Sequence, residues 1–123
     1  YTMMNDVTAR DIQRREGKFT RAKGFDTFAP LGPHLDTDFV PSDQAIQVRV
    51  NDTLRQDGKL SDMIFDVSRL IAFISAFMTL EPMDVISTGT PAGVGPLVPG
   101  DKVDVSIAGL GTLRNHVSAR EDV

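Results

Sequence analysis

Cysteine and tryptophan are absent from this 123-residue sequence, and histidine occurs only twice. Without cysteine the chain has no disulfide bond, no thiolate zinc site and no cysteine nucleophile. Basic residues are also in deficit, since 13 Lys and Arg face 17 Asp and Glu, which argues against a nucleic-acid surface. The longest apolar run, residues 70–77, is interrupted by Ser75 and is far too short to cross a membrane.

The remaining composition is that of an ordinary folded protein. Hydrophobic residues make up 41% and charged residues 24%, enough to build the core of one domain at this length. The lack of cysteine fits a reducing compartment, so we expect a cytoplasmic protein. The chain begins at Tyr1, without an initiator Met, and runs directly into structured-looking sequence. We therefore expect residues 1–123 to be part of a single domain whose upstream portion is absent.

Short strands are predicted where apolar and polar residues alternate or where a short apolar run is bounded by turn formers. Asn51-Asp52 predicts the turn of a hairpin, and Gly109-Leu110-Gly111 predicts a second turn. The stretch from Phe19 to Pro33 is rich in turn formers and predicts a loop. The predicted strands cover residues 1–4, 46–50, 53–56, 85–87, 103–107 and 112–117.

Two helices are predicted, which makes the fold class α+β and mainly β. The first is short, with Thr8 as its N-cap and Gly17 closing it. The second spans residues 67–78, with Asp66 as N-cap and Glu81-Pro82 as its stop. Its apolar residues recur at helical spacing, so we expect four of them to be buried against the sheet: Leu70, Ile71, Ile74 and Phe77.

A first candidate site lies where the first strand gives way to the first helix. Asp6 would project a carboxylate into a cleft there, and Arg10 and Gln13 follow at a spacing of about one helical turn. A hard oxygen ligand beside Arg and Gln fits the edge of a Mg²⁺ site that binds an anionic substrate. The local alternative is that Asp6 caps the helix and Arg10 pairs with Asp11 or Glu16.

Two further segments carry candidate residues. Lys23 lies among small and aromatic residues, where it could hold an oxyanion or an enolate, although it also fits a solvated loop lysine. The stretch 87–96, Ser-Thr-Gly-Thr-Pro-Ala-Gly-Val-Gly-Pro, allows close backbone approach and offers Thr hydroxyls to a carboxylate. It lacks the phosphate-loop pattern, and it also fits a plain connection full of turn formers.

Taken in order along the chain, these segments resemble the fumarylacetoacetate hydrolase family. The resemblance includes members named 2-hydroxyhepta-2,4-diene-1,7-dioate isomerase and acylpyruvate hydrolase, and it covers almost the whole chain. Each motif is short, but all occur in the right sequence. The segments that carry the resemblance are residues 5–13, 23–27, 30–33, 51–58, 61–65, 80–95 and 109–115.

The resemblance implies a mixed β-sandwich roll that holds a divalent ion, Mg²⁺ or else Mn²⁺ or Ca²⁺. Asp6 falls on a metal ligand of the family, and Lys23 falls on a metal-adjacent lysine that stabilises developing negative charge. Arg10 and Gln13 fall on residues that polarise the substrate and position water. Thr27 falls beside the metal-bound water network, and Thr90 falls on a residue that binds the substrate carboxylate.

One departure limits this carry-over. The family's Glu-x-Glu metal ligands and its His-containing lid lie upstream of Asp6, so the sequence contains one of the three expected carboxylates. Its own glutamates, Glu16, Glu81 and Glu121, are scattered. We expect that the fragment by itself is not a competent metal site.

The function that the resemblance implies is Mg²⁺-dependent hydrolysis of a C–C bond in a small acylpyruvate or fumarylacetoacetate-like diketo acid. The first alternative is isomerisation of a 2-hydroxyhepta-2,4-diene-1,7-dioate in aromatic catabolism, and the second is decarboxylation of the oxaloacetate type. A non-catalytic structural or binding module on the same scaffold is the alternative of a different class. The resemblance further implies a homodimer and a small 2-oxo acid partner, and we expect neither nucleic acid nor membrane as a partner.

Overall fold

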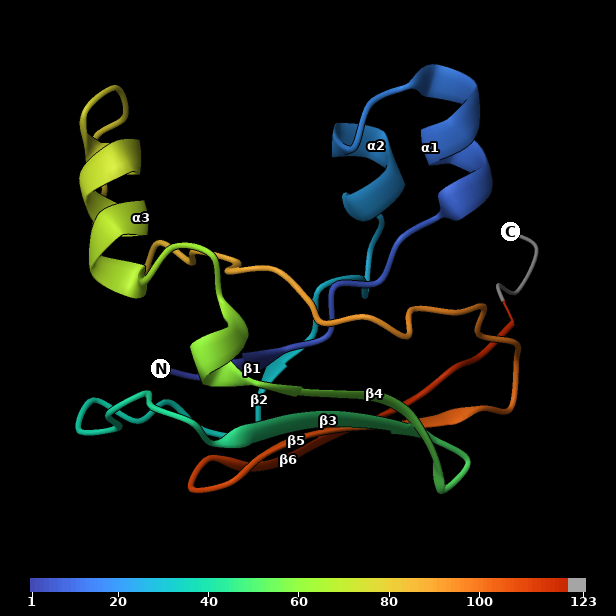
Figure 1. The fold of residues 1–123 in the computed structure, drawn as a ribbon. Helices are drawn as coiled ribbons and strands as arrows, with labels where there is room; N and C mark the ends of the chain where they lie inside the picture. The colour runs from blue at the N-terminus through green and yellow to red at the C-terminus, as the bar shows by residue number, and fades with distance from the viewer. Residues whose placement is uncertain (120–123) are drawn as a thin grey trace.

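The computed structural model describes residues 1–119 and shows an antiparallel sheet with two helical arms standing above it (Figure 1). The arm of α1 and α2 rises on one side, and α3 rises on the other. In chain order the elements are β1 (Met3–Met4), α1 (Arg10–Glu16), α2 (Thr20–Lys23), β2 (Leu31–Gly32), β3 (Ala45–Val50), β4 (Thr53–Lys59), the 3-10 helix η1 (Leu60–Asp62), α3 (Val67–Ser75), β5 (Lys102–Ile107) and β6 (Gly111–His116).

The main sheet has four antiparallel strands in the order β4-β3-β5-β6. Asn51 and Asp52 connect β3 to β4 with φ values of 50° and 67°, which is the left-handed backbone of a two-residue hairpin turn. Gly111 opens β6 with a φ of 92°, and Gly109 in the preceding turn has a φ of 93°. Both predicted turns and the strands around them are confirmed, and so is the mainly β, α+β class.

The core lies between the main sheet and the small β1–β2 ribbon. On β5, Val103, Val105 and Ile107 face this core and are at most 7% exposed, as the alternation of the sequence predicts. Met3 of β1, only 2% exposed, packs into the same cluster. The β1–β2 ribbon is thereby fixed on the sheet, and it carries the first candidate segment with it.

The first helical arm differs in detail from the prediction. Gly17 closes α1 with a φ of 64°, as expected. Thr8 is not the N-cap: that position is Ala9, which has no side-chain cap, while the Thr8 hydroxyl donates to the Asp6 carbonyl. The predicted loop at 19–33 also contains the short helix α2, which contacts α1, and the short strand β2, which pairs with β1.

The second arm, α3, forms where predicted but ends at Ser75 rather than at residue 78. Asp66 caps it by accepting a 2.7 Å hydrogen bond from the Arg69 N–H. The predicted packing is wrong for residues 1–119, because α3 stands clear of the sheet and buries no residue (Figure 1). Ile71 is 43% exposed and Phe77 is 64% exposed, while Leu70 and Ile74 are only partly buried.

The predicted strand at 85–87 is also wrong. Residues 85–87 form no strand in the described structure, and neither of its two sheets includes them. Helical periodicity and apolar runs indicate which residues prefer to be buried. They do not indicate which part of the protein packs against those residues. Within residues 1–119 no helix is long and apolar enough to span a membrane.

Truncating a leucine in the core should destabilise the protein more than truncating an exposed leucine of the same sheet. Leu113 of β6 is 7% exposed and belongs to the core cluster, so Leu113→Ala should lower the free energy of unfolding by about 2–5 kcal/mol. Leu54 of β4 is 40% exposed, and Leu54→Ala is the matched control, with a loss below about 1 kcal/mol. Urea unfolding measures both, and equal losses would contradict the assignment of the core.

The opposite face of the sheet carries an ion pair with two hydrogen bonds. Arg114 of β6 donates to the two carboxylate oxygens of Asp104 through Nε at 2.7 Å and Nη2 at 2.8 Å. The hydrogen bonding from Arg114 lowers the pKa of the Asp104 carboxyl below its usual range, and this outweighs the opposite effect of desolvation. The ionised carboxylate is therefore the form that the fold favours.

This pair should give the protein an acid-sensitive share of its stability. Because the folded pKa of Asp104 is lowered, the contribution is present at neutral pH and is lost as the pH falls below about 4. Asp104→Asn should therefore weaken the fold at pH 7 and lose less stability on acidification than the parent does. Urea unfolding at several pH values measures this, with the exposed Asp38→Asn as control. Parallel pH profiles for parent and Asp104→Asn would contradict it.

Candidate functional site

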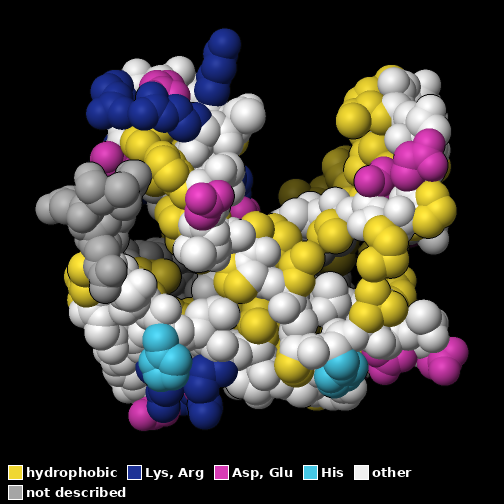
Figure 2. Space-filling model, turned by 180° about the vertical axis from the view of Figure 1, so that it is seen from behind, with side chains coloured by type: hydrophobic (Ala, Val, Ile, Leu, Met, Phe, Trp, Pro, Cys, Tyr) yellow, Lys and Arg dark blue, Asp and Glu magenta, His cyan; other side chains and the backbone are white. Residues whose placement is uncertain are grey.

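A hollow lies between the two helical arms and above the sheet (Figure 2). Its floor is largely hydrophobic, and charged side chains gather on the α1–α2 arm at its edge. Five of the six residues singled out from the sequence line this hollow, and Gln13 does not. Those that line it are Asp6, Arg10, Lys23, Thr27 and Thr90.

The backbone around Asp6 explains why it lies at the hollow. The N–H of Asn5 donates to the Pro30 carbonyl at 3.1 Å, which extends the β1–β2 pairing by one step. Farther along, the N–H of Ala9 donates to the Ala22 carbonyl at 2.9 Å, and Ala22 is completely buried. One bond ties the start of the segment 5–9 to the chain beside β2, and the other ties its end to α2, so Asp6 is held between them.

Asp6 and Lys23 form an ion pair in which the Lys23 Nζ donates to the Asp6 Oδ2. The partners are 17 residues apart, and their side chains are 31% and 34% exposed, so the pair is partly shielded from solvent. The Lys23 ammonium also lies 5.6 Å from the centre of the Phe19 ring. Lys23 is thus neither a loop residue nor a freely solvated lysine: it ends α2 and points its charge at Asp6.

Arg10 and Gln13 meet on α1 as their spacing suggested. The Arg10 Nη1 donates to the Gln13 Oε1 at 2.6 Å, and this contact replaces the alternative pairing with Asp11 or Glu16. Glu16 instead accepts from the Arg21 Nη1 at 2.8 Å. The bond orients the Arg10 guanidinium, which lines the hollow, while Gln13 lies behind it.

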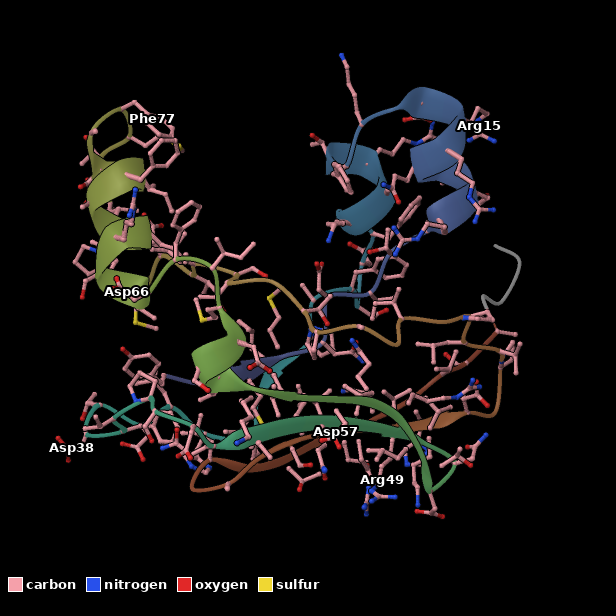
Figure 3. All side chains as sticks on the ribbon, in the orientation of Figure 1. Arg15, Asp38, Arg49, Asp57, Asp66 and Phe77 are labelled. Atoms are coloured by element: carbon pink, nitrogen blue, oxygen red, sulfur yellow. The ribbon has the colours of Figure 1, made fainter. Side chains whose placement is uncertain are left out.

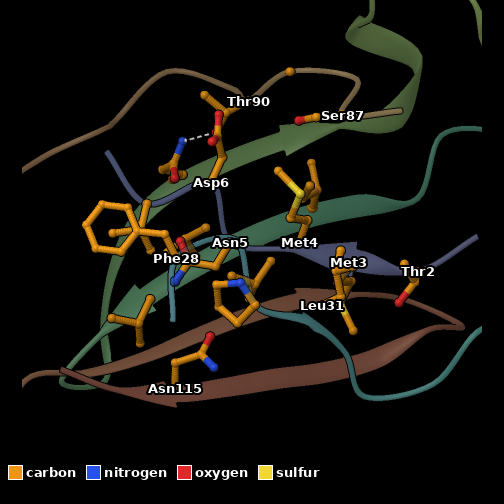
Figure 4. Close-up of a pocket in the computed structure, with 18 of the residues that line it drawn as sticks. Thr2, Met3, Met4, Asn5, Asp6, Phe28, Leu31, Ser87, Thr90 and Asn115 are labelled. Atoms are coloured by element: carbon orange, nitrogen blue, oxygen red, sulfur yellow. Dashed lines mark hydrogen bonds between the residues drawn. The ribbon is translucent and has the colours of Figure 1, made fainter. Parts of the chain in front are cut away.

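The segment 87–96 passes close over β4, which positions Thr90. Gln56, buried on β4, donates from Nε2 to the Thr90 Oγ1 at 2.8 Å and to the Pro91 carbonyl at 2.7 Å (Figure 4). Gly93 permits this approach: a Cβ there would lie 2.0 Å from the Arg55 carbonyl oxygen, and its φ is 102°. Gly93 therefore serves close packing on β4, and Thr90 is held toward the same hollow as Asp6.

Thr27 lies on the segment between α2 and β2 with a φ of 69°, a backbone region that a β-branched residue seldom adopts. It lines the hollow together with Phe28, and Phe28 packs against Phe25 with ring centres 5.4 Å apart. Packing of the neighbouring aromatic residues holds the unusual backbone in place.

Gln56, Arg14 and Asn115 are polar residues that also line the hollow and were not singled out from the sequence. Gln56 looked like an ordinary residue of a hairpin arm, and only its burial beneath Thr90 gives it a role. Asn115 of β6 points from the sheet toward the segment carrying Asn5, and its Oδ1 is buried without a hydrogen-bond donor among residues 1–119 (Figure 4). No local sequence pattern identifies such residues, because their roles depend on which distant segments of the chain pack against them.

The described residues do not by themselves fit a Mg²⁺ site. Among residues 1–119, no three His, Asp or Glu side chains gather closely enough to hold a metal ion. Asp6 is one carboxylate, and it is already engaged by Lys23. Since Mg²⁺ requires near-octahedral oxygen coordination, Asp6 could supply one ligand of a larger set but cannot form a site alone.

The comparison with known families agrees with the resemblance in the sequence. The family model for the fumarylacetoacetate (FAA) hydrolase C-terminal domain matches residues 1–118. The chain therefore belongs to the fumarylacetoacetate hydrolase family.

Three relatives with named activities show how the family varies. A 5-carboxymethyl-2-hydroxymuconate delta-isomerase structure from Mycobacterium smegmatis is 50% identical, with a TM-score of 0.96, over 99% of this chain and 49% of its own. A fumarylacetoacetate hydrolase structure from Exiguobacterium antarcticum is 46% identical, with a TM-score of 0.92. This match covers 98% of this chain and 47% of the hydrolase chain. Oxaloacetate tautomerase YisK of Bacillus subtilis is 45% identical over 95% of this chain and 42% of its own.

The chain spans about half the length of the curated relatives that it matches, namely 51%, 46% and 57% of three archaeal proteins. The similarity thus covers nearly all of these 123 residues but only part of each relative. What the relatives do as whole proteins bears on this chain only as support for a proposal.

Adding one methyl group at Gly93 should dislodge Thr90. Gly93→Ala would force a Cβ into the Arg55 carbonyl, so we expect residues 90–93 to lift from β4 and the free energy of unfolding to fall by about 1–3 kcal/mol. Gly95→Ala is the matched control, because nothing lies within 4 Å of the added Cβ. Thermal unfolding compares the two, and equal stability would contradict the close packing.

Metal binding should need more than Asp6. The chain of residues 1–123 is expected to bind Mg²⁺ weakly at most, and Asp6→Asn should change that binding little, because one carboxylate paired with Lys23 provides too little charge. Calorimetric titration with Mg²⁺ measures both forms. Tight binding that Asp6→Asn abolishes would mean that a second carboxylate, such as Asp11 or Asp26, completes a site.

Proposed function

We propose that this protein is an enzyme that binds a small 2-oxo acid and stabilises its enolate. The observation that carries the proposal is the Lys23 ammonium, held beside Asp6 at a hollow that Thr90 and Arg10 also line. A cation that is partly shielded from water interacts strongly with an enolate oxygen. Family membership supports the same chemistry.

Each residue would have a separate task. The Thr90 hydroxyl, oriented by Gln56, would donate to the substrate carboxylate, and Arg10 would add a positive charge nearby. Lys23 would turn from Asp6 toward the keto oxygen and hold the negative charge that forms there when a C3 proton passes to a water molecule. Asp6 would hold the Lys23 side chain in position until the substrate arrives.

The names of two relatives support isomerisation through this enolate as the reaction. One relative is named a delta-isomerase and another an oxaloacetate tautomerase, at 50% and 45% identity. Both reactions move a proton and a double bond, which requires enolate stabilisation and no second nucleophile. Hydrolysis of a C–C bond is the second candidate, because a fumarylacetoacetate hydrolase is 46% identical. Decarboxylation of a 2-oxo diacid would use the same enolate.

The remaining parts of the proposal rest on the family resemblance. A divalent ion, Mg²⁺ first and Mn²⁺ or Ca²⁺ as alternatives, would find one oxygen ligand in Asp6. We further propose a cytoplasmic homodimer. Light scattering of the full-length protein at micromolar concentration tests the dimer, and a monomeric mass would contradict it.

Exchange of the C3 protons of 2-oxo acids for deuterium tests the central claim. NMR of full-length protein with oxaloacetate, an acylpyruvate and a hydroxymuconate-type diacid reports exchange, isomerisation, C–C cleavage and decarboxylation in one experiment. Lys23→Met should slow exchange about 10²–10³-fold, because it removes the charge that stabilises the enolate. Thr90→Val should instead raise KM by about tenfold, since it removes one hydrogen bond to the carboxylate.

Lys18→Met is the matched control, because Lys18 lies on the same arm but does not line the hollow. It should leave exchange unchanged. Full activity in Lys23→Met would contradict the assignment of the cation. Binding without exchange of any 2-oxo acid would favour a non-catalytic binding module on this scaffold.

A further inference from the structure

One face of α1 presents two arginines to the hollow. Arg10, Asp11 and Arg14 line it, whereas Gln13 and Arg15 on the same helix do not. At 100° per residue the three lining positions fall within about 100° of the helix circumference, which makes them one continuous face. Arg14 stands one turn beyond Arg10, about 6 Å farther along the helix axis.

The basic residues of the α1–α2 arm divide into engaged and available groups. The Glu16 Oε1 atom lies 3.7 Å from the Arg15 Nη2 and 2.8 Å from the Arg21 Nη1. Lys23 is paired with Asp6. The Arg14 side chain forms no hydrogen bond or ion pair with any residue in the range 1–119. Its guanidinium is exposed at the edge of the hollow with its donors free for a ligand.

The charge balance of this face favours a second anionic group. Asp6 and Lys23 offset each other, while Arg10 and Arg14 outnumber Asp11 by one positive charge. Asp11 belongs to none of the ion pairs among residues 1–119, so it cancels neither arginine through a close contact. A planar guanidinium binds a carboxylate with two parallel hydrogen bonds, which suits the end of an extended diacid.

We propose that Arg14 is a specificity residue that selects 2-oxo acids carrying a second carboxylate several carbons from the 2-oxo group. This inference rests on the proposed function, since it takes the 2-oxo carboxylate to bind near Thr90 and Arg10. A substrate that extends from there along α1 meets Arg14 next. A monocarboxylic 2-oxo acid of equal length has an uncharged group at that end, which cannot form an ion pair with the Arg14 guanidinium.

The test compares two six-carbon acids, 2-oxoadipate and 2-oxohexanoate, on the full-length protein. C3 deuterium exchange gives kcat and KM for each acid, and calorimetry gives the Kd of each independently of turnover. The parent should prefer 2-oxoadipate. Arg14→Gln should reduce that preference by about three- to tenfold through KM and Kd, with kcat and the values for 2-oxohexanoate nearly unchanged.

Arg15→Gln is the matched control, because Arg15 is the next residue, carries the same charge and points away from the hollow (Figure 3). It should leave the preference intact, and Arg14→Lys should restore part of it. An unchanged preference in Arg14→Gln, or equal effects of Arg14→Gln and Arg15→Gln, would overturn the proposal. If neither acid exchanges but the binding preference still depends on Arg14, the enolate chemistry fails and the specificity residue stands.

Discussion

The attachment of the β1–β2 ribbon to the main sheet is the constraint on which the rest of the site depends. Met3 fills the core over β5 and β6, and its strand pairs with β2 across the 26 intervening residues 5–30. Everything between those two strands, including the whole α1–α2 arm, is a loop whose ends are fixed by this pairing. Asp6 and Lys23 are therefore held by the core, although neither belongs to it.

The sequence predicts those parts of the fold whose cause is local. Alternation of Val103, Val105 and Ile107 defines one face of β5, and the left-handed turn at Asn51-Asp52 needs only residues that tolerate it. The surroundings of α3 have no such local cause. Its apolar periodicity is as clear as that of a buried helix, yet Ile71 is 43% exposed, because α3 stands clear of the sheet.

The candidate site divides in the same way. Asp6, Arg10 and Lys23 stand out because charged residues at element ends are conspicuous, and family resemblance adds Thr90. Gln56 could not be identified from the sequence, because its role depends on hydrogen bonds to Thr90 and Pro91, which lie more than 30 residues away along the chain. The role of Gly93 is likewise visible only against the carbonyl of Arg55. Contacts between distant segments decide which polar residues matter, and a single sequence does not record them.

The Asp6–Lys23 pair has a consequence for what this hollow can bind. A lone ammonium beside an apolar floor would be costly to shield from water, and a lone carboxylate would repel an anionic substrate. Paired, the two groups are close to neutral, so the arginines of α1 determine the sign of the field at the edge of the hollow. An anionic oxygen can then compete with Asp6 for Lys23 at a modest cost, because the displaced Asp6 carboxylate remains partly exposed and is hydrated by solvent. This exchange of partners lets one cation serve both the resting fold and a developing enolate.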